Sequence, residues 1–317
     1  MYFHEDKELF KEFLNNKKIE SGIDIDILEK DYYVCEFLHE LAKKQDDLKA
    51  YFKGGTAVYK ILNNEIRFSE GIDLTVRKDL DASNTSNQKR LEKSVFDFDI
   101  TATILNNEKS IKKKDTVIAF YNYDTVSTTI KLSLQRQSEI QIEATSFTVS
   151  EPVKKYIVEH IIYKLANTHE REILKEKYNI APFEIEIIAL ERIFVDKIFA
   201  TEFYYTREEY ASVAKHLFDI YYLMQNIDIQ NILKDNQTLN ILIRYKREEE
   251  TRRIGGVSNE LKLRDFRYFN LKDNSKIEEA FNLMQEKYVY NNKYIVNFKG
   301  VKESLVKLYE IIKEINI

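Results

Sequence analysis

A glycine pair between a lysine and a threonine is the part of this chain best suited to bind phosphate. Lys53-Gly54-Gly55-Thr56 follows a short apolar pair and precedes a stretch with helical apolar spacing. Glycine lets the backbone approach a phosphate closely, and a helix N-terminus presents N–H groups and a dipole that favours anions. We therefore predict that Gly54 and Gly55 contact phosphate. The Thr56 hydroxyl would donate to the same group, and Lys53 would pair with it. The alternative is a plain strand-to-helix turn.

A strand with a single carboxylate follows this turn. Residues 67–74 read Arg-Phe-Ser-Glu-Gly-Ile-Asp-Leu, and a strand is predicted over 72–77. Residues i and i+2 of a strand point to the same face, so an Asp-x-Asp strand aims two carboxylates at one site. Two divalent ions about 3.5–4 Å apart can clamp both ends of a displacement at phosphorus, and magnesium requires oxygen ligands. Asp73 supplies one carboxylate, but Gly71 stands where the second is required.

Three explanations of Gly71 remain open from the sequence. An introduced substitution has disabled an active enzyme, or natural decay has left a protein that no longer catalyses the reaction. In both cases the loss of a bridging carboxylate is expected to weaken metal binding. In the third explanation a bulge at the glycine rotates Glu70 onto the metal face, because bulges re-aim side chains.

Composition limits the classes of protein to which this chain can belong. Its 317 residues exceed what one hydrophobic core usually serves, so two domains are expected. The net charge of −4 argues against a basic protein that coats DNA. One cysteine permits neither an internal disulfide nor a cysteine zinc site, and it fits a reducing cytosol. The N-terminus lacks an apolar run of signal-peptide length, and no window is apolar enough to span a membrane, so a cytoplasmic location is expected.

Apolar spacing predicts a mixed half of helices and strands, followed by an all-helical half. The expected fold class is α+β, with a mixed sheet flanked by helices in a domain at 1–200 and a helical bundle at 201–317. Helices are predicted over 5–20, 26–45, 56–62, the start of 86–107, most of 151–178, 189–204, 207–226, 228–246, 276–288 and 301–315. Strands are predicted over 51–52, 72–77, 116–121, 128–135, 139–145 and 183–187, and the clearest loop over 252–275.

Two motifs, in order and at a suitable spacing, resemble those of a known family. Phe52-Lys53-Gly54-Gly55-Thr56-Ala57-Val58 and segment 67–74 are similar to the KGGTAL and RFSEDIDL motifs of the AbiEii/AbiGii-type nucleotidyltransferase toxins. That family belongs to the DNA polymerase β-like nucleotidyltransferase superfamily. The resemblance covers roughly residues 30–225 and implies a nucleotidyltransferase fold, magnesium as the metal, a nucleoside triphosphate as substrate and an antitoxin as partner. Related toxins point to RNA as the acceptor, such as the 3′ end of tRNA.

The resemblance also assigns roles to residues farther along the chain. Glu143 resembles the third carboxylate of the family, so Asp73 and Glu143 are expected to hold metal and to be catalytic. Lys197 resembles a lysine that contacts nucleotide phosphate, although helical spacing alone would make it an edge residue with a buried stem. Arg67 and Lys53 are candidate phosphate contacts, and the alternative for both is solvated surface charge.

Asp219 lies in an apolar run that resembles the RDLYDL element of the family. A carboxylate in such a run is expected to be partly buried and therefore to need a partner. Asp219 can form an i,i+4 pair with Lys215 worth roughly 0.3–0.5 kcal/mol. Alternatively it orients Lys197 or serves as a catalytic base. His216 replaces the first Asp of the element, and none of the five histidines has metal-ligand spacing, so they receive no role.

A basic segment with interleaved aromatic residues lies in the C-terminal half. It contains Arg244, Lys246, Arg247, Arg252, Arg253, Lys262, Arg264 and Arg267. Such a segment can hold an RNA backbone and stack bases. Glu248-Glu249-Glu250 interrupts it, and charge runs are usually solvated faces.

The predicted function is the transfer of a nucleotide from a nucleoside triphosphate to an RNA or protein acceptor, by the toxin of a toxin–antitoxin pair. The alternative is a catalytically degenerate module that still binds nucleotide or RNA, and Gly71 favours it. A purely structural interaction protein would require the phosphate-binding turn to be accidental.

Overall fold

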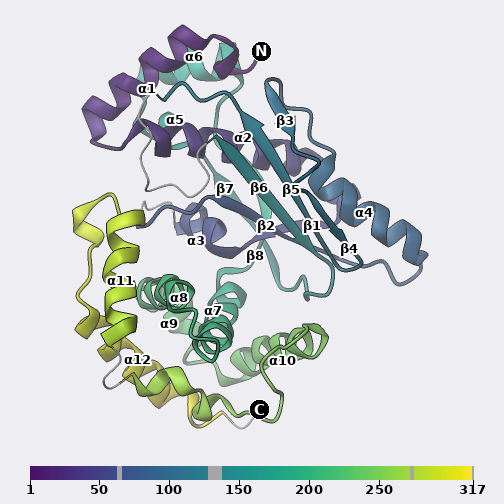
Figure 1. Ribbon diagram of the computed structural model, residues 1–317, viewed down its shortest axis with the longest axis vertical. Coiled ribbons are helices and arrows are strands. Elements are labelled where there is room, and N and C mark those ends of the chain that lie inside the picture. The colour runs from purple at the N-terminus through teal and green to yellow at the C-terminus, as the bar shows by residue number, and fades with distance from the viewer. Residues whose placement is uncertain (63–65, 128–137, 272–274, 316–317) are drawn as a thin grey trace. The chain divides into compact units, whose positions relative to one another are not determined.

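A mixed β-sheet carries the predicted phosphate turn and metal-binding strand (Figure 1). The computed structural model describes residues 1–62, 66–127, 138–271 and 275–315. Within them the sheet has eight strands: β1 (Ala50–Lys53), β2 (Gly71–Val76), β3 (Thr103–Leu105), β4 (Ile111–Lys113), β5 (Thr116–Tyr123), β6 (Glu139–Thr145), β7 (Val153–Val158) and β8 (Phe183–Ile188). The strand order is β3-β5-β6-β2-β1-β8-β7, and β4 also pairs with β5.

The central strands alternate buried and half-buried residues. β2 is antiparallel to β1 and parallel to β6, and β6 is antiparallel to β5. Phe52, Leu74 and Ala144 on one face are fully buried. The residues beside them in the chain, such as Asp73 and Glu143, are half-buried on the other face. Since side chains alternate along a strand, burial of one face fixes which residues occupy the opposite face.

Two long helices cover the buried face of the sheet. They are α2 (Ile25–Leu48) and α4 (Asn84–Phe96), which contact β2 and β6 (Figure 1). The rings of Phe37 on α2 and Tyr121 on β5 pack with their centroids 4.8 Å apart. Apolar burial of this kind is the main source of stability for such a layer. The sheet is therefore anchored on one side, and Asp73 lies on the opposite side.

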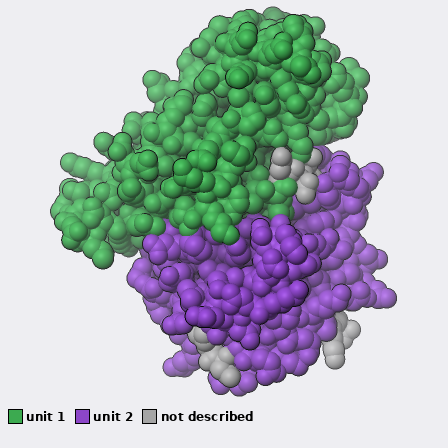
Figure 2. All heavy atoms as spheres, turned by 180° about the vertical axis from the view of Figure 1, so that it is seen from behind, with its two compact units in different colours: residues 1–64, 68–146, 153–187 green, residues 65–67, 147–152, 188–317 purple. Residues whose placement is uncertain are grey.

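The chain divides into two compact units (Figure 2). Unit 1 comprises residues 1–64, 68–146 and 153–187, and unit 2 comprises 65–67, 147–152 and 188–317. Besides the sheet, α2 and α4, unit 1 contains α1 (Lys7–Ser21), α3 (Gly54–Leu62), α5 (Ile161–Leu165), α6 (Thr168–Tyr178) and the 3₁₀ turn η1 (Phe3–Glu5). None of the helices in the described part of the chain has the length and hydropathy that a membrane crossing requires.

Unit 2 is built from helices around α8 (Tyr210–Leu223). This helix packs against α7 (Leu190–Tyr205), α11 (Ser275–Tyr288) and α12 (Phe298–Ile312). The remaining described elements of the unit are α9 (Ile227–Ile232), α10 (Asn236–Arg252) and the 3₁₀ turns η2 (Leu263–Asp265), η3 (Arg267–Asn270) and η4 (Asn292–Tyr294). The domain boundary predicted after residue 200 would fall inside α7, whereas the compact units divide after residue 187.

The α+β class, with a mixed sheet flanked by helices and helices at the C-terminal end, is confirmed. The prediction that 151–178 is mostly helical is wrong at its start, where β7 precedes α5 and α6. β7 carries exposed Lys154 and Lys155, and these charges conceal the strand pattern. The single helix predicted over 228–246 is two helices, because Asp235 caps a new one at α10. Strands β3 and β4 were not predicted, and the strand predicted at 128–135 lies outside the described residues.

Candidate functional site

Asp73 and Glu143 are register partners on two parallel strands of unit 1. Asp73 of β2 pairs with Glu143 of β6, and Gly71 pairs with Gln141 in the same ladder. Neighbouring strands lie about 4.8 Å apart, and paired residues point to the same face. The two predicted metal-binding carboxylates therefore project from adjacent strands at the same level of the sheet. This is the arrangement that a shared metal ion requires.

Gly54 lies directly against the Asp73 carboxylate. A Cβ atom built on Gly54 would lie 2.0 Å from Asp73 Oδ2, and the glycine has a φ of +85°. Both facts require glycine, because other residues are strained at positive φ and their Cβ would overlap the carboxylate. Gly54 begins α3, so Asp73 sits at the N-terminus of a helix, where the dipole favours negative charge. The turn and the carboxylate form one local site.

Substitution of Gly54 by alanine is expected to destabilise the protein by more than about 1 kcal/mol, because it adds a steric overlap to the strain of a positive φ. Gly22→Ala is the matched control. Gly22 has a φ of +75° but no heavy atom within 4 Å of its Cβ position. Urea unfolding of both variants measures the difference. An equal loss of stability in the two variants would show that crowding of Asp73 is unimportant.

The Thr56 side chain forms hydrogen bonds within the protein. Its hydroxyl donates to Gly71 O over 2.5 Å, lies 2.9 Å from Ser69 Oγ, and is in a residue only 1% exposed. A hydroxyl has one proton to donate, and this one is committed to a backbone carbonyl. In this arrangement Thr56 ties α3 to the start of β2, and its predicted donation to phosphate stays a prediction.

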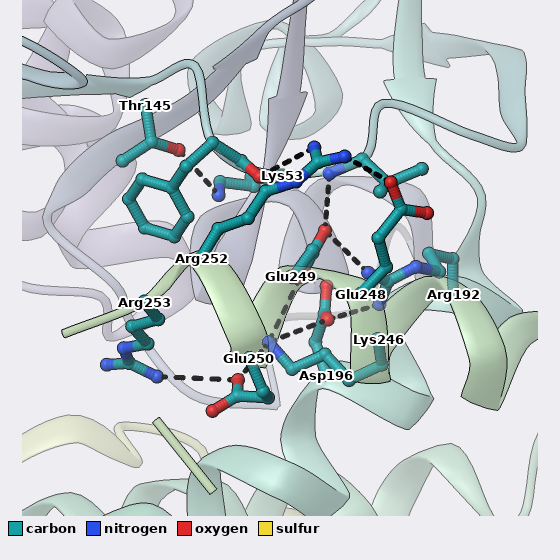
Figure 3. A network of polar contacts seen from close by, with 12 residues as sticks. Lys53, Thr145, Arg192, Asp196, Lys246, Glu248, Glu249, Glu250, Arg252 and Arg253 are labelled. Atoms are coloured by element: carbon teal, nitrogen blue, oxygen red, sulfur yellow. Dashed lines mark hydrogen bonds and ion pairs between the residues drawn. The ribbon is translucent and has the colours of Figure 1, made fainter. Parts of the chain in front are cut away.

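Lys53 lies opposite Asp73 on the neighbouring antiparallel strand. The two are cross-strand partners in the β1–β2 ladder, so both point to the half-buried face. Lys53 Nζ donates to Thr145 Oγ1 over 3.1 Å, a contact drawn in Figure 3. The same face of unit 1 thus carries a cation and two carboxylates. The role of Lys53 as a phosphate contact stays a prediction.

Gly71 lies in a regular strand. The β2–β6 ladder is continuous from Gly71 to Thr75, so there is no bulge between these residues. Glu70 precedes the strand and is buried. The ladder therefore gives no support to a bulge within β2, and the placement of Glu70 on the metal face stays a hypothesis. A Cβ on Gly71 would meet Gln141 O at 3.8 Å, which is ordinary van der Waals contact, so the position has room for a Cβ.

The carboxylates present can serve one magnesium ion. Among the described residues no group of three or more His, Cys, Asp or Glu side chains is arranged to hold a metal. Magnesium is commonly bound by one or two carboxylates together with substrate phosphates and water, which fits Asp73 and Glu143. A second ion would need a bridging carboxylate at position 71. The donor set therefore fits one ion and lacks a ligand for the other.

A buried charge cluster in unit 2 joins three predicted site residues. Arg67 forms a bidentate ion pair with Asp219. Its Nε lies 2.6 Å from Oδ1, and its Nη2 lies 2.8 Å from Oδ2. Lys197 Nζ lies 2.8 Å from Asp219 Oδ2. All three residues are at least 95% buried. Arg67 was predicted to contact phosphate; two of its guanidinium nitrogens pair with Asp219, and the phosphate contact stays a prediction. We name Arg67, Lys197 and Asp219 the buried triad.

The buried triad fixes the ionisation of Asp219. Burial by itself would raise the pKa of this carboxyl, but the charges of Arg67 and Lys197 overcome that effect and hold the pKa well below its usual range. A carboxylate so strongly held in its ionised form is a poor proton acceptor. Of the two functional roles left open by the sequence, orientation of Lys197 fits this geometry better than the role of catalytic base.

His216, which received no role in the sequence analysis, lies near the buried triad. It lies one turn before Asp219 on α8, and its ring stacks on Tyr204 of α7 with centroids 5.4 Å apart. Burial and then the charge of Lys197 lower the pKa of His216 well below its usual value, so its imidazole is neutral at pH 7. Its position beside Asp219 in the RDLYDL-like element was the available signal, because residues i and i+3 share a helix face.

A second network in unit 2 corrects the prediction of a solvated acidic run (Figure 3). Glu249 and Glu250 are each only 3% exposed. Arg192 binds Asp196 and lies 2.6 Å from Glu249, and Lys246 lies 2.8 Å from Glu250. Lys246 therefore turns inward. So does Arg247, which donates to Ser258 O and Leu261 O. Only part of the predicted basic segment faces solvent.

The predicted site residues thus form two sets. Unit 1 holds the phosphate-turn residues and the two carboxylates, namely Lys53, Gly54, Gly55, Thr56, Asp73 and Glu143. Unit 2 holds Arg67, Lys197 and Asp219. Segment 67–74 is divided between the units, since its arginine belongs to unit 2 and its aspartate to unit 1.

Comparison with known proteins finds a matching family and a similar solved structure for this chain. A protein-family model described as "Nucleotidyl transferase AbiEii toxin, Type IV TA system" matches residues 36–295. Among solved structures, MenT4, a nucleotidyltransferase toxin from Mycobacterium tuberculosis H37Rv, is similar with a TM-score of 0.54 and 11% identity. The similarity covers 94% of this chain and 98% of that one, and at this identity it shows a shared fold. A search of curated proteins gave no match.

Proposed function

Because the chain belongs to the family of nucleotidyl transferase AbiEii toxins of type IV toxin–antitoxin systems, we propose that it binds a nucleoside triphosphate and transfers its nucleotide to an acceptor hydroxyl. The observation that carries the proposal is the register pair of Asp73 and Glu143 beside the Gly54 turn. A phosphate-binding helix start and two oxygen ligands on one sheet face are the parts that this chemistry needs.

Each residue has a distinct role in the proposed reaction. The acceptor oxygen attacks the α-phosphorus, the bond from that phosphorus to the bridging oxygen breaks, and pyrophosphate leaves. Backbone N–H groups at Gly54 and Gly55 bind triphosphate oxygens. Asp73 and Glu143 would hold magnesium, which supplies charge neutralisation when bound. The family resemblance implies a phosphate contact for Lys197, and that role is part of the proposal.

Asp219 and Arg67 act through Lys197 in this proposal. Asp219 holds the ammonium group of Lys197, and Arg67 keeps Asp219 ionised and fixed by a bidentate contact. Both are therefore proposed as positioning residues. The attacking hydroxyl must lose its proton to some other group, since neither Asp219 nor Arg67 can take it.

Gly71 limits the proposed activity. The reaction would run with one carboxylate fewer than the Asp-x-Asp pattern supplies, so nucleotide binding is expected to persist while transfer is slow. A second candidate function follows from the same residue: a protein that binds nucleotide and no longer transfers it. An RNA acceptor, an antitoxin partner and a cytoplasmic location belong to the proposal as well.

The test separates binding from transfer. Titration calorimetry with each nucleoside triphosphate and magnesium measures binding, and transfer of label from α-³²P nucleotides to total RNA or protein measures activity. Asp73→Asn and Glu143→Gln should weaken magnesium-dependent binding, and Gln141→Asn, on the same face, is the matched control. Binding without transfer would favour the second candidate. No binding of any nucleotide by the folded chain would refute both.

A further inference from the structure

Two arginines of unit 2 pack against one phenylalanine ring. The guanidinium carbons of Arg207 and Arg253 each lie 3.6 Å from the centroid of the Phe203 ring. A cation at this distance from an aromatic face is held by the ring quadrupole. Phe203 comes from the C-terminal turn of α7, and Arg253 directly follows α10. We call these three residues the arginine platform.

Hydrogen bonds hold the Arg207 side chain of the arginine platform in place. Arg207 Nη1 donates to Phe203 O over 2.7 Å, and Nη2 donates to Gly255 O over 2.6 Å. These bonds tie the end of α7 to the loop after α10 and fix the plane of the guanidinium. A preorganised guanidinium loses less conformational entropy when it binds a ligand. The side chain is therefore held in place before any ligand arrives.

The positive charge of the platform is poorly compensated. The contacts of Arg207 within the described residues are with backbone carbonyls and the Phe203 ring, none with a carboxylate. Arg253 lies 3.8 Å from Glu250, whose carboxylate is shared with Lys246 and the Val257 amide. Glu208 and Glu209 follow Arg207 in the chain and are exposed.

An aromatic path links the platform to the buried triad within unit 2. The rings of Phe203 and Tyr204 meet edge to face at 5.2 Å, and Tyr204 stacks on His216. Lys197 lies six residues before Phe203 on α7, which is about 9 Å along the helix axis. A molecule held by the platform would lie within reach of the lysine that the proposed reaction uses.

We propose that the arginine platform binds a single-stranded RNA. Guanidinium planes stack on unpaired bases, and free guanidinium N–H groups bind phosphate, so the pair offers both contacts that single strands use. The statement that this RNA is the nucleotide acceptor rests on the proposed function. The statement that the platform binds RNA does not depend on it. The platform uses Arg253 of the basic segment together with Arg207, which the segment does not include.

The experiment measures binding of a fluorescein-labelled single-stranded RNA of mixed sequence to the full chain by anisotropy, without nucleotide or magnesium. Arg253→Gln is expected to weaken binding about tenfold or more, the scale of removing one stacked base. The slope of log affinity against log salt should fall by about 0.7 for each phosphate that the variant no longer neutralises. Arg207→Lys keeps the charge and removes the planar group, so it should lower affinity and leave the salt slope unchanged.

Arg244→Gln is the matched control, because Arg244 is an exposed arginine on α10. An equal loss of affinity in this variant would mean diffuse charge attraction and would overturn the proposal. Unchanged RNA affinity in Arg253→Gln, with weakened binding of a polyglutamate peptide, would assign the platform to an acidic protein partner and also overturn it. Platform-dependent RNA binding with no transfer in any variant would uphold the platform and count against the proposed reaction.

Discussion

Replacing Gly71 by aspartate is expected to raise nucleotidyl transfer by at least about 10–100-fold. Mutation of a residue that supports a metal ligand typically lowers metal affinity or activity by about 10–100-fold. A side chain that binds the metal directly is expected to have at least as large an effect. The substitution restores the Asp-x-Asp pattern, because residues 71 and 73 share one face of β2. The Cβ of the new side chain has room, since its nearest neighbour is Gln141 O at 3.8 Å. Labelled nucleotide, magnesium and total RNA provide the assay.

Gly71→Asn is the matched control for this gain. Asparagine has nearly the same shape as aspartate but no charge, so it should raise transfer much less. Adding Glu143→Gln to Gly71→Asp should remove most of the gain, because the two carboxylates would share the metal. If Gly71→Asp and Gly71→Asn gave the same rate as the unchanged chain, position 71 would have no part in metal binding.

Replacing Asp219 by asparagine is expected to lower the free energy of unfolding by about 3–5 kcal/mol at pH 7. The substitution leaves Arg67 and Lys197 as buried cations without their common counter-charge. Urea unfolding at pH 7 measures the loss. Asp47→Asn, at an exposed position near the end of α2, is the matched control and should change stability by less than about 0.5 kcal/mol.

The effect of Asp219 on stability depends on pH in a defined direction. The pKa of Asp219 is lowered in the folded protein, so the unfolded chain takes up a proton first as the pH falls. The stabilisation is therefore fully present above the usual aspartate pKa near 3.8 and is lost as the pH falls through the folded value. Wild type and Asp219→Asn should differ most at neutral pH and converge in strong acid. A constant difference down to pH 2 would contradict this assignment.

The variants also separate positioning from catalysis. Lys197→Met leaves Arg67 paired with Asp219, so it should destabilise the fold less than Asp219→Asn does. It should nevertheless weaken triphosphate binding if Lys197 contacts phosphate. In a Gly71→Asp background, where transfer is measurable, Arg67→Lys should reduce the rate through a misplaced Lys197. A normal rate with a lowered stability would assign Arg67 to the fold alone.

The local parts of the site could be predicted because they depend on short-range rules. Glycine at 54, a strand over Asp73 and the same-face relation of positions 71 and 73 all follow from backbone conformation and a two-residue period. Those rules also exposed Gly71 as the missing ligand. Burial of one sheet face then determined that Asp73 and Glu143 share the other face, and the register that makes them partners came from the structure.

The sequence by itself determined which residue types and which periodicities are available: a glycine turn, a carboxylate strand, a lysine helix and an α+β order of elements. Only the tertiary structure decided how the charges are used. Arg67 and Asp219 are 152 positions apart, and their bidentate contact joins a predicted phosphate-binding residue to a predicted catalytic one. Lys246, Arg247, Glu249 and Glu250 look solvated in sequence but are buried. The physical reason is that a buried charge is stable only with a partner, and partners are chosen by packing between distant segments, which no local pattern encodes.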